Sequence, residues 1–498
     1  MSEMRGNNVL RPNIILITID ALRRDRLGCY GYHKNTSPNI DCLARTSLMF
    51  RNAFSSGPNT PHAFMGIMAS QYPFTSKELS VRNCPSTLAD ILLENGYWTQ
   101  GFNAGNPWVS RYYGYDRGFS ELIDFLELQS IDDPGLKLVF KKERLEMMDT
   151  QGNSYLKEIA LQSVLRHCLP KFLRAHMTRV ARRLADYFFY MDHIKVKLKI
   201  ERRFTPSVIE WIMRNDREPF FLWIHFMTVH EPYAPPIIDQ VLANRKVLWR
   251  NSVNRLRREA EYRLQSNAIT PSYKSQFSSL YDAGIRRVDR YIGSIMRALN
   301  KRDVYHRSWI ILCSDHGEEF FEHGGLFHSS KLDDEVLRVP LLMRLPEQDF
   351  SRIVSQRVGL IDLLPTIAEY IGIDFDRNVY EGRSFGKIPN GSLCEDGDER
   401  ILAAEVFYDE HNISIGFNPY DTCGVPRRLC LHNGKFKFIA DCTRQNLEIY
   451  NVEKDPLERN DLSKTHPRLR KVAEDIIREH LRNSERKRLA FARKKFSH

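Results

Sequence analysis

At 498 residues, the chain is long enough for one large α/β domain or for about three domains of ~150 residues each. Its 42% hydrophobic and 27% charged residues are close to the average for globular proteins, which excludes a disordered or collagen-like chain. The 73 basic residues exceed the 62 acidic ones by 11, and this positive charge favours anionic partners.

The N-terminal residues and the cysteines indicate the compartment. Met1 to Arg11 are polar, and the apolar run that follows, Ile14–Ile19, is too short for the hydrophobic core of a secretory signal. The nine cysteines form no CxxC pair and are odd in number, which favours a reducing environment over a disulfide framework. No apolar run reaches the ~18 residues of a membrane-spanning helix. We therefore expect a cytoplasmic protein.

Three short apolar segments are predicted to be buried strands of a parallel sheet. They are Asn13–Ile19, Phe220–Phe226 and Ser308–Cys313. Helical patterns lie between them, at Ser86–Glu94, Pro206–Arg214 and Tyr281–Asn300. This alternation predicts an α/β fold. Because ligands of such sheets bind beyond the carboxyl ends of the strands, the polar residues at those ends are site candidates.

The pattern changes after Pro365. Short strand-like runs appear, at Ile401–Phe407, Leu429–Leu431 and Lys435–Ile439. The pair Asn433-Gly434 predicts a hairpin turn between the last two. We predict a main domain over residues 1–380 with a basic helical insertion at about 130–205, a smaller C-terminal α+β subdomain over 381–465, and a basic helical tail over 466–498.

The strongest basic block of the chain lies between Arg166 and Arg203. Its apolar residues recur at spacings of three and four, which predicts an amphipathic basic helix. The simpler interpretation is a solvated helix packed on its own domain. The alternative is peripheral contact with anionic lipid on the inner face of a membrane, since basic amphipathic helices bind such surfaces.

Acidic residues and a histidine follow two of the predicted strands. Ser314-Asp315-His316-Gly317-Glu318 comes directly after one strand, and Asp20 follows another. Carboxylates and imidazole with open coordination positions can hold a divalent cation that acts as a Lewis acid on an anionic ester. Taken singly, an aspartate after a strand is commonly only a helix cap.

Together, these residues resemble the sulfatase family of the alkaline phosphatase superfamily over nearly the whole chain. The similar stretches come in family order: Asn13–Gly31 (NIILITIDALRRDRLGCYG), Ser37–Asp41, Phe50–Ser70, Gly118-Phe119, Trp223–Pro236 (WIHFMTVHEPYAPP), Ser314–Gly325 (SDHGEEFFEHGG), Arg338–Pro340, Asp362–Thr366 and Tyr450–Leu462. The resemblance implies an alkaline-phosphatase-like large mixed sheet flanked by helices, with a smaller C-terminal α+β subdomain.

The family's Cys-x-Pro-Ser-Arg motif, whose cysteine becomes formylglycine, is absent. Counting back from Met68–Pro73 (MASQYP), which resembles the family's Leu-Thr-Gly-x-Tyr-Pro, places Thr60 at the nucleophile position. Anchoring on Pro61 would place Asn59 there, and an asparagine cannot act as a nucleophile. We therefore expect no formylglycine. Threonine at this position resembles phospho-transferring relatives, such as phosphoethanolamine transferases and lipoteichoic acid synthase.

The resemblance implies one divalent metal ion held by Asp20, Thr60, Asp315 and His316. Ala21 replaces the second aspartate of the usual adjacent pair, and His316 stands where many sulfatases carry asparagine. Exchanging a hard oxygen ligand for imidazole favours manganese or zinc, with calcium or magnesium as the alternatives.

Further catalytic residues are implied by the same resemblance. His230 and His328 resemble family histidines that contact the transferred group or protonate the leaving oxygen, which an imidazole can do near its unperturbed pKa of ~6.5. Lys331 resembles a family lysine beside the anion. For Asn106, His225 and His323 we favour a structural role, although relatives carry an asparagine near the first of these.

The mechanism we expect is in-line attack by Thr60 on a metal-bound phosphorus or sulfur centre. The resulting covalent Thr60 ester is released to water or to an acceptor alcohol. Three functions follow: a sulfatase-like hydrolase of sulfate or phosphate esters, a transferase that moves a phospho-alcohol group onto a glycan or lipid acceptor, or a non-catalytic relative that binds an anionic glycan or lipid. The substrate is expected to be glycan- or lipid-linked. No specific nucleic-acid partner is expected, because the basic runs lack a recognition motif.

Overall fold

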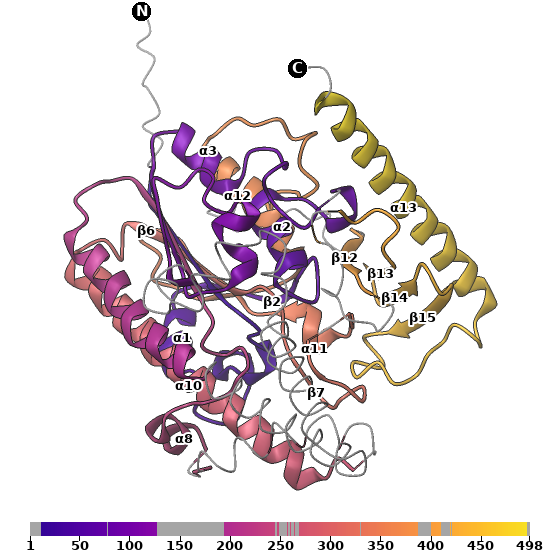
Figure 1. Ribbon diagram of the computed structural model, residues 1–498, viewed down its shortest axis with the longest axis horizontal. Helices are drawn as coiled ribbons and strands as arrows, with labels where there is room; N and C mark the ends of the chain where they lie inside the picture. The colour runs from indigo at the N-terminus through magenta and orange to yellow at the C-terminus, as the bar shows by residue number, and fades with distance from the viewer. Residues whose placement is uncertain are drawn as a thin grey trace, which may run out of the picture.

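The structure is a computed structural model that describes residues 11–76, 78–126, 194–244, 268–328, 330–386, 400–409 and 421–495, with 247, 248, 256, 259, 263 and 419 as further positions. Its large sheet is flanked by helices (Figure 1). Among the described residues this sheet has nine strands. Their order is β11 (Arg352–Gly359), β2 (Leu48–Phe54), β10 (Leu341–Arg344), β6 (Ser308–Ser314), β1 (Asn13–Ile19), β5 (Phe220–Phe226), β3 (Trp98–Asn103) and β4 (Glu121–Asp124), and β9 (Arg338–Val339) pairs with β2. The predicted large mixed sheet is confirmed.

The three strands predicted from sequence lie side by side at the centre of this sheet. β1 pairs in parallel with β5 on one side and with β6 on the other. Every residue of the three strands is buried, because helices cover both faces of the sheet. β10 runs antiparallel to β6 and β2, which makes the sheet mixed.

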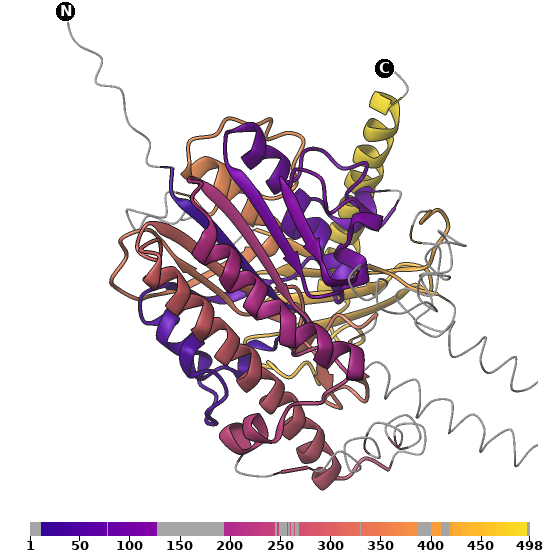
Figure 2. The same ribbon diagram turned by 60° about the vertical axis from the view of Figure 1, so that its left-hand side comes forward.

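Helices lie on both sides of the large sheet (Figure 2). Alternate residues of β1 pack against the two helix layers. Ile15, Ile17 and Ile19 belong to a core shared with α1 (Pro38–Ala44), α10 (Pro271–Lys301) and the described helix 194–214. Ile14 and Leu16 belong to a core shared with α2 (Thr60–Ala69), α3 (Leu88–Glu94) and α12 (Leu363–Tyr370). The two-residue period of a strand thus divides the core into two halves.

Helix α10 begins ten residues before the predicted start at Tyr281. Thr270 caps it, with Oγ1 accepting a hydrogen bond from the backbone N–H of Tyr273 at 3.2 Å, and Pro271 occupies the first turn. Proline lacks the N–H that the first turn leaves unpaired, so it fits there. The prediction started too late because the first turns of α10 carry many polar residues.

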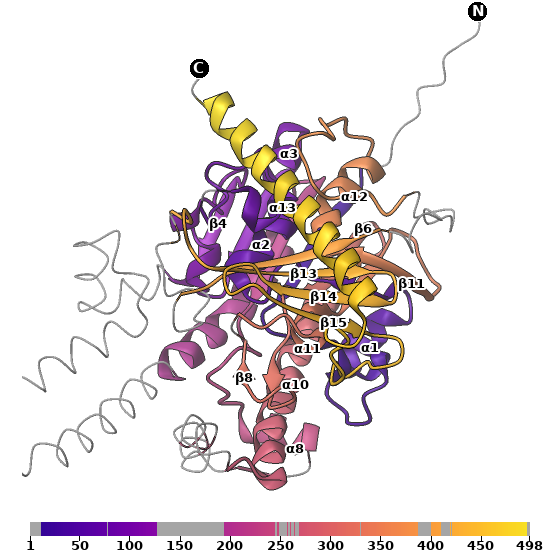
Figure 3. The same ribbon diagram turned by 90° about the vertical axis from the view of Figure 1, so that its right-hand side faces the viewer.

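A second, antiparallel sheet follows the large one (Figure 3). Its strands are, in order, β12 (Leu402–Phe407), β13 (Arg427–Asn433), β14 (Phe436–Asp441) and β15 (Asn446–Asn451). Gly434 takes a positive φ of 58° in the predicted turn between β13 and β14. Helix α13 (Pro467–Lys495) packs across this sheet through Ala473 and Ile477. Strand β15 was not predicted from the sequence, and β13 is longer than the predicted run Leu429–Leu431.

The C-terminal sheet touches the main sheet's helix α2 near its first turn. His62 Nε2 accepts a hydrogen bond from the backbone N–H of Phe407 at 3.0 Å, and its Nδ1 lies 2.5 Å from Asn59 Oδ1. The backbone N–H of Glu405 donates to the carbonyl of Ser56 at 2.9 Å. Strand β12 is therefore hydrogen-bonded to the turn that precedes α2.

Two predictions fall largely outside the described residues. Of the basic block Arg166–Arg203, only residues 194–203 are described, as part of the helix 194–214. The predicted domain boundaries and the lipid contact of this block stay predictions. No helix among the described residues combines the length and the apolar character that a membrane crossing requires.

Candidate active site

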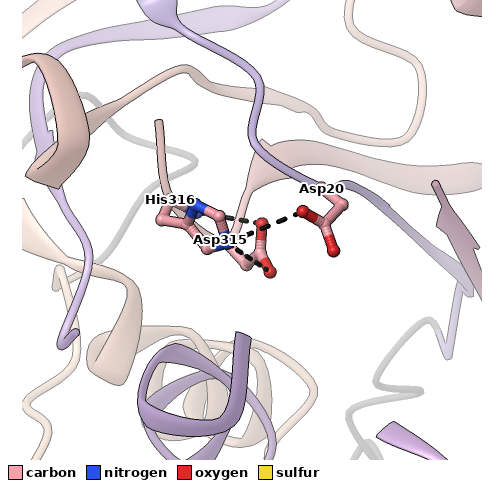
Figure 4. A group of neighbouring side chains, drawn as sticks. All are labelled: Asp20, Asp315 and His316. Carbon is pink, nitrogen blue, oxygen red and sulfur yellow. Dashed lines mark hydrogen bonds and ion pairs between the residues drawn. The ribbon is translucent and has the colours of Figure 1, made fainter. Parts of the chain in front are cut away.

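The candidate site lies where the central parallel strands end. Asp20 follows β1, and Asp315 and His316 follow β6. The register pairs Ile19 with Phe226 of β5 and with Ser314 of β6, so the three strands reach the same edge. Figure 4 shows the side chains of Asp20, Asp315 and His316 converging there. The structure thus brings together three of the four predicted metal ligands at one point.

The geometry of these three side chains suits a cation. His316 Nε2 lies 3.6 Å from Asp20 Oδ1 and 3.6 Å from Asp315 Oδ2. His316 Nδ1 lies 2.8 Å from the carbonyl of Gly317, which only accepts, so Nδ1 carries the proton and the lone pair of Nε2 faces the carboxylates. All three side chains are fully buried, and Asp20 Oδ1, Asp315 Oδ2 and His316 Nε2 have no hydrogen-bond partner. Buried acceptors without donors are costly, and a divalent ion would satisfy all three.

The pKa values of the three groups follow from their burial and proximity. Burial by itself raises the pKa of Asp20, but the neighbouring His230 and His225 hold it below its usual range. Burial, together with the charge of Asp20, raises the pKa of Asp315 well above its usual value. Burial lowers the pKa of His316 to about 3, so the ring stays neutral, as a metal ligand must be. A cation would relieve the repulsion between the two carboxylates.

Thr60, the predicted nucleophile, lies beside this cluster. It is the first residue of α2 and is 3% exposed. Its Oγ1 donates a hydrogen bond to Asp20 Oδ2 at 3.1 Å. The positive end of the α2 dipole favours negative charge at this position. The hydroxyl predicted from the sequence spacing therefore reaches a carboxylate that belongs to the candidate metal cluster.

Asn106, expected to be structural, lies in the same cluster. Its Nδ2 donates to Asp20 Oδ2 at 2.8 Å and lies 3.3 Å from Thr60 Oγ1. Its Oδ1 accepts from the backbone N–H of Trp108 at 3.0 Å, which fixes the orientation of the amide. The side chain can therefore donate to an oxygen bound at Thr60.

His225 also lies closer to the site than expected. Its Nε2 is 3.7 Å from Asp20 Oδ2, and its Nδ1 is 2.9 Å from Thr18 Oγ1. The residue belongs to β5, where it is fully buried. The sequence held one signal for this position: residue 225 is the last but one of β5 and so lies near the strand end.

His230 and His328 stand next to one another at the cluster. Their ring centroids are 5.0 Å apart, and the His328 ring is 4.3 Å from that of His316. His328 Nδ1 lies 3.0 Å from Glu318 Oε1, and Glu318 Oε2 accepts a hydrogen bond from the Tyr233 hydroxyl at 2.6 Å. Burial alone would lower the pKa of His328, but the Glu318 carboxylate raises it to about 9. Glu318 and Tyr233 were not predicted as site residues from the sequence, and their link to His328 depends on the fold.

Lys331 is not brought into this cluster by its hydrogen bonds. Its Nζ pairs with Glu319 Oε2 at 2.9 Å and donates to the carbonyl of His323 at 2.7 Å. His323 in turn lies 2.7 Å from Glu335 Oε1 and 3.0 Å from the carbonyl of Leu457. Because both ring nitrogens of His323 face acceptors, both must donate, so this histidine is a cation in an ion pair.

Comparison with known proteins identifies the family. The model of the family described as Sulfatase matches residues 12–373. The chain belongs to the sulfatase family. Its predicted membership, and with it the class of sulfatase-like ester hydrolases, is confirmed.

Individual relatives of this sulfatase-family chain have low sequence identity to it but match most of its length. The uncharacterized sulfatase YidJ of Escherichia coli is 24% identical over 91% of this chain and 83% of its own length. An N-acetylglucosamine-6-O-sulfatase of Bacteroides thetaiotaomicron is 22% identical over 91% of this chain and 82% of its own. Among solved structures, the phosphonate monoester hydrolase of Agrobacterium radiobacter superposes with a TM-score of 0.62 at 18% identity, covering 95% of each chain. This last likeness bears on the fold alone.

Proposed function

We propose that the protein is a metal-dependent hydrolase of sulfate or phosphate-type esters that uses Thr60 as its nucleophile. The observation that carries the proposal is the position of the Thr60 hydroxyl, 3.1 Å from Asp20 Oδ2, beside three buried ligand atoms without hydrogen-bond partners. A hydroxyl is a weak nucleophile unless a base or a metal favours its alkoxide form. Asp20, Asp315 and His316 would hold a divalent ion, which would supply Lewis-acid activation of the hydroxyl and of the ester. Manganese or zinc is the ion that this ligand set favours.

The residues of the chain account for the proton transfers. Thr60 Oγ1 forms a bond to the phosphorus or sulfur centre, and the bond from that centre to the leaving oxygen breaks. The Thr60 proton passes to Asp20 Oδ2, its hydrogen-bond acceptor. His328 gives a proton to the leaving oxygen, since Glu318 favours its charged form. Water then attacks the Thr60 ester and returns one proton to His328, while Thr60 recovers its own from Asp20.

Two further side chains lie beside the reacting groups. Asn106 Nδ2 lies 3.3 Å from Thr60 Oγ1, so it can donate to a non-bridging oxygen of a group attached there. His230 lies beside His328 and contributes a second imidazole to the leaving-group side. A donor is most effective when it is held in place before the reaction, as burial holds Asn106 here.

A substrate panel tests the proposal. Aryl sulfates, aryl phosphomonoesters, phosphodiesters and phosphonate monoesters are each assayed with manganese, zinc, calcium and magnesium. We expect turnover of at least one ester with manganese or zinc, and mass spectrometry of the quenched enzyme should detect the ester mass on the Thr60 peptide. An unmodified Thr60 peptide under conditions of full turnover would contradict the nucleophile assignment.

Transfer to an alcohol is the second candidate, and Thr60 itself favours it. A threonine ester is stable enough to await either water or an acceptor alcohol, whereas formylglycine chemistry requires a cysteine that this position lacks. The same assay with added glycerol or a simple sugar separates the two. Hydrolysis predicts one product alcohol per phosphate or sulfate released, while transfer predicts a new ester of the added alcohol.

A further inference from the structure

A lysine of the helix 194–214 reaches the loop that carries His230. Lys197 Nζ donates a hydrogen bond to the carbonyl of His230 and lies 3.2 Å from the carbonyl of Pro232. Lys197 is half-buried, whereas the other described basic residues of the block are exposed; these are Lys195, Lys199, Arg202 and Arg203. Lys197 is thus turned from the solvated side of its helix toward the active-site loop.

The backbone carbonyls of the 230–232 loop need a hydrogen-bond donor. His230 Nδ1 lies 2.6 Å from the carbonyl of Glu231, so the ring donates to its own loop and Nε2 is left for the site. Together with the two carbonyls that face Lys197, three successive carbonyls of the loop are occupied. Lys197 donates to the loop from the neighbouring helix. Because the His230 ring belongs to this loop, its position depends on how the loop is held.

Three carboxylates near Lys197 favour its charged form. Burial lowers the pKa of Lys197 to about 8, while the carboxylates of Glu201, Asp20 and Glu231 oppose that shift. Glu201, one turn further along the helix, is paired with Arg287 of α10 at 2.8 Å. An ammonium kept out of water is costly unless its hydrogens are bonded, and the two loop carbonyls supply those bonds.

We infer that Lys197 is a positioning residue that holds the 230–232 loop, and through it the His230 imidazole, in place for ester cleavage. The inference rests on the proposed function. It assigns a role in the active site to the carboxyl-terminal part of the basic block, for which the sequence suggested a solvated face or a lipid contact.

Kinetics of single and double variants test the inference. Lys197→Met removes the donors and the charge at nearly constant length, and Lys199→Met, on the same helix, is the matched control. With an aryl ester that the enzyme turns over, we expect Lys197→Met to lower kcat by about 10- to 100-fold with little change in KM, as misplacement of a reacting group does. Lys197→Arg, which keeps donors and charge, should recover most of the activity.

The double variant separates positioning from general structural support. If Lys197 acts through His230, adding Lys197→Met to His230→Ala should lower kcat by less than about threefold further, because coupled residues are non-additive. Full multiplication of the two single effects would overturn the inference, as would equal effects of Lys197→Met and Lys199→Met.

A measurement without turnover keeps the inference testable if the proposed function fails. In ¹³C-labelled histidine spectra, the His230 ring signal, assigned by its loss in His230→Ala, should shift in Lys197→Met and stay in place in Lys199→Met. An unmoved signal in Lys197→Met would overturn the role of Lys197. Absence of turnover by the unmodified enzyme on the whole panel would instead overturn the proposed function.

Discussion

Two clusters of buried carboxylates in this molecule differ in how their negative charge is balanced. In the first, Asp334 and Glu458 are joined by Lys437, whose Nζ lies 2.9 Å from Asp334 Oδ1 and also pairs with Glu458. In the second, Asp20 and Asp315 share His316, whose facing nitrogen carries no proton. The first cluster has its cation built into the chain. In the second, a bound cation would be needed to balance the carboxylates, which supports the proposal that Asp20, Asp315 and His316 form a metal site.

Their pKa values express the same contrast. Burial lowers the pKa of Lys437, but Asp334 and Glu458 outweigh it and raise that pKa well above its usual value, so the lysine is firmly charged. At the other cluster, burial and the Asp20 charge raise the pKa of Asp315. Buried acidic density alone therefore does not identify a metal site. What supports the candidate site is that three buried acceptor atoms without hydrogen-bond partners, on Asp20, Asp315 and His316, lie within 4.8 Å of one another.

The largest expected effect comes from removing a carboxylate of the open cluster. Asp315→Ala should lower kcat/KM by about 10⁴-fold, or ~5 kcal/mol, because the ion loses a ligand and Thr60 its activation. In metal-free buffer, Asp315→Asn should unfold at an equal or higher temperature than the unmodified protein, since it removes the repulsive charge and keeps an acceptor for the backbone N–H groups of Ala21 and His316. Steady-state assays and thermal melts measure both. A melting temperature lowered by several degrees without metal would contradict the account of this cluster.

Removing the Lys437 cation should lower stability and leave metal binding unchanged. Lys437→Met leaves Asp334 and Glu458 buried without their partner, and we expect a loss of about 3–5 kcal/mol in the free energy of unfolding. Urea denaturation measures the loss, and Lys435→Met on the same hairpin is the control, because Lys435 is exposed. Metal affinity of the folded variant should be unchanged. A neutral effect on stability would show that the two clusters do not differ in the way described.

Metal binding should stabilise only through the open cluster. At an ion concentration of 100 times its Kd, the unmodified protein should gain about 2.7 kcal/mol, which chelation reverses. Thermal melts with and without manganese or zinc measure the gain, and Asp315→Ala should show almost none. An equal gain in Asp315→Ala would place the ion elsewhere.

The smallest effect concerns His323, which joins the loop after β6 to the C-terminal part of the chain. The hydrogen bond that His323 donates to Glu335 raises the pKa of His323 to about 9. A pKa raised on folding gives stability that is complete below the unfolded value of ~6.5 and is lost as the pH rises through 9. His323→Gln should therefore cost about 1 kcal/mol at pH 6 and much less at pH 10, with the exposed His466→Gln as the control. A cost independent of pH would contradict the ion pair.

The sequence was sufficient for the centre of the fold and for part of the site. β1, β5 and β6 are short and apolar throughout, and parallel neighbours end at one edge, so Asp20, Asp315 and His316 had to meet. Thr60 was placed by counting back from Met68–Pro73, which resembles a family motif. These are features of local pattern and spacing.

The remaining features depend on tertiary geometry. Asn106 reaches Asp20 only because its amide is oriented by the backbone of Trp108, and Lys197 reaches His230 only because its helix packs beside the loop. Lys331 is drawn to Glu319, one of several acidic residues nearby in the sequence, and spacing does not select among them. Strand β15 begins and ends with polar residues, which obscured its pattern.

The hydrogen bond from Phe407 to His62 joins the smaller sheet to the first turn of α2. His62 follows Thr60, the proposed nucleophile, by two residues, so strand β12 supports the helix turn that places Thr60 beside Asp20. A fragment ending at residue 386 would keep Asp20, Thr60, Asp315 and His316. It would lose the hydrogen bond from Phe407 that supports the first turn of α2. A chimera that receives the C-terminal sheet of a relative must therefore keep the hydrogen bond between residue 62 and that sheet.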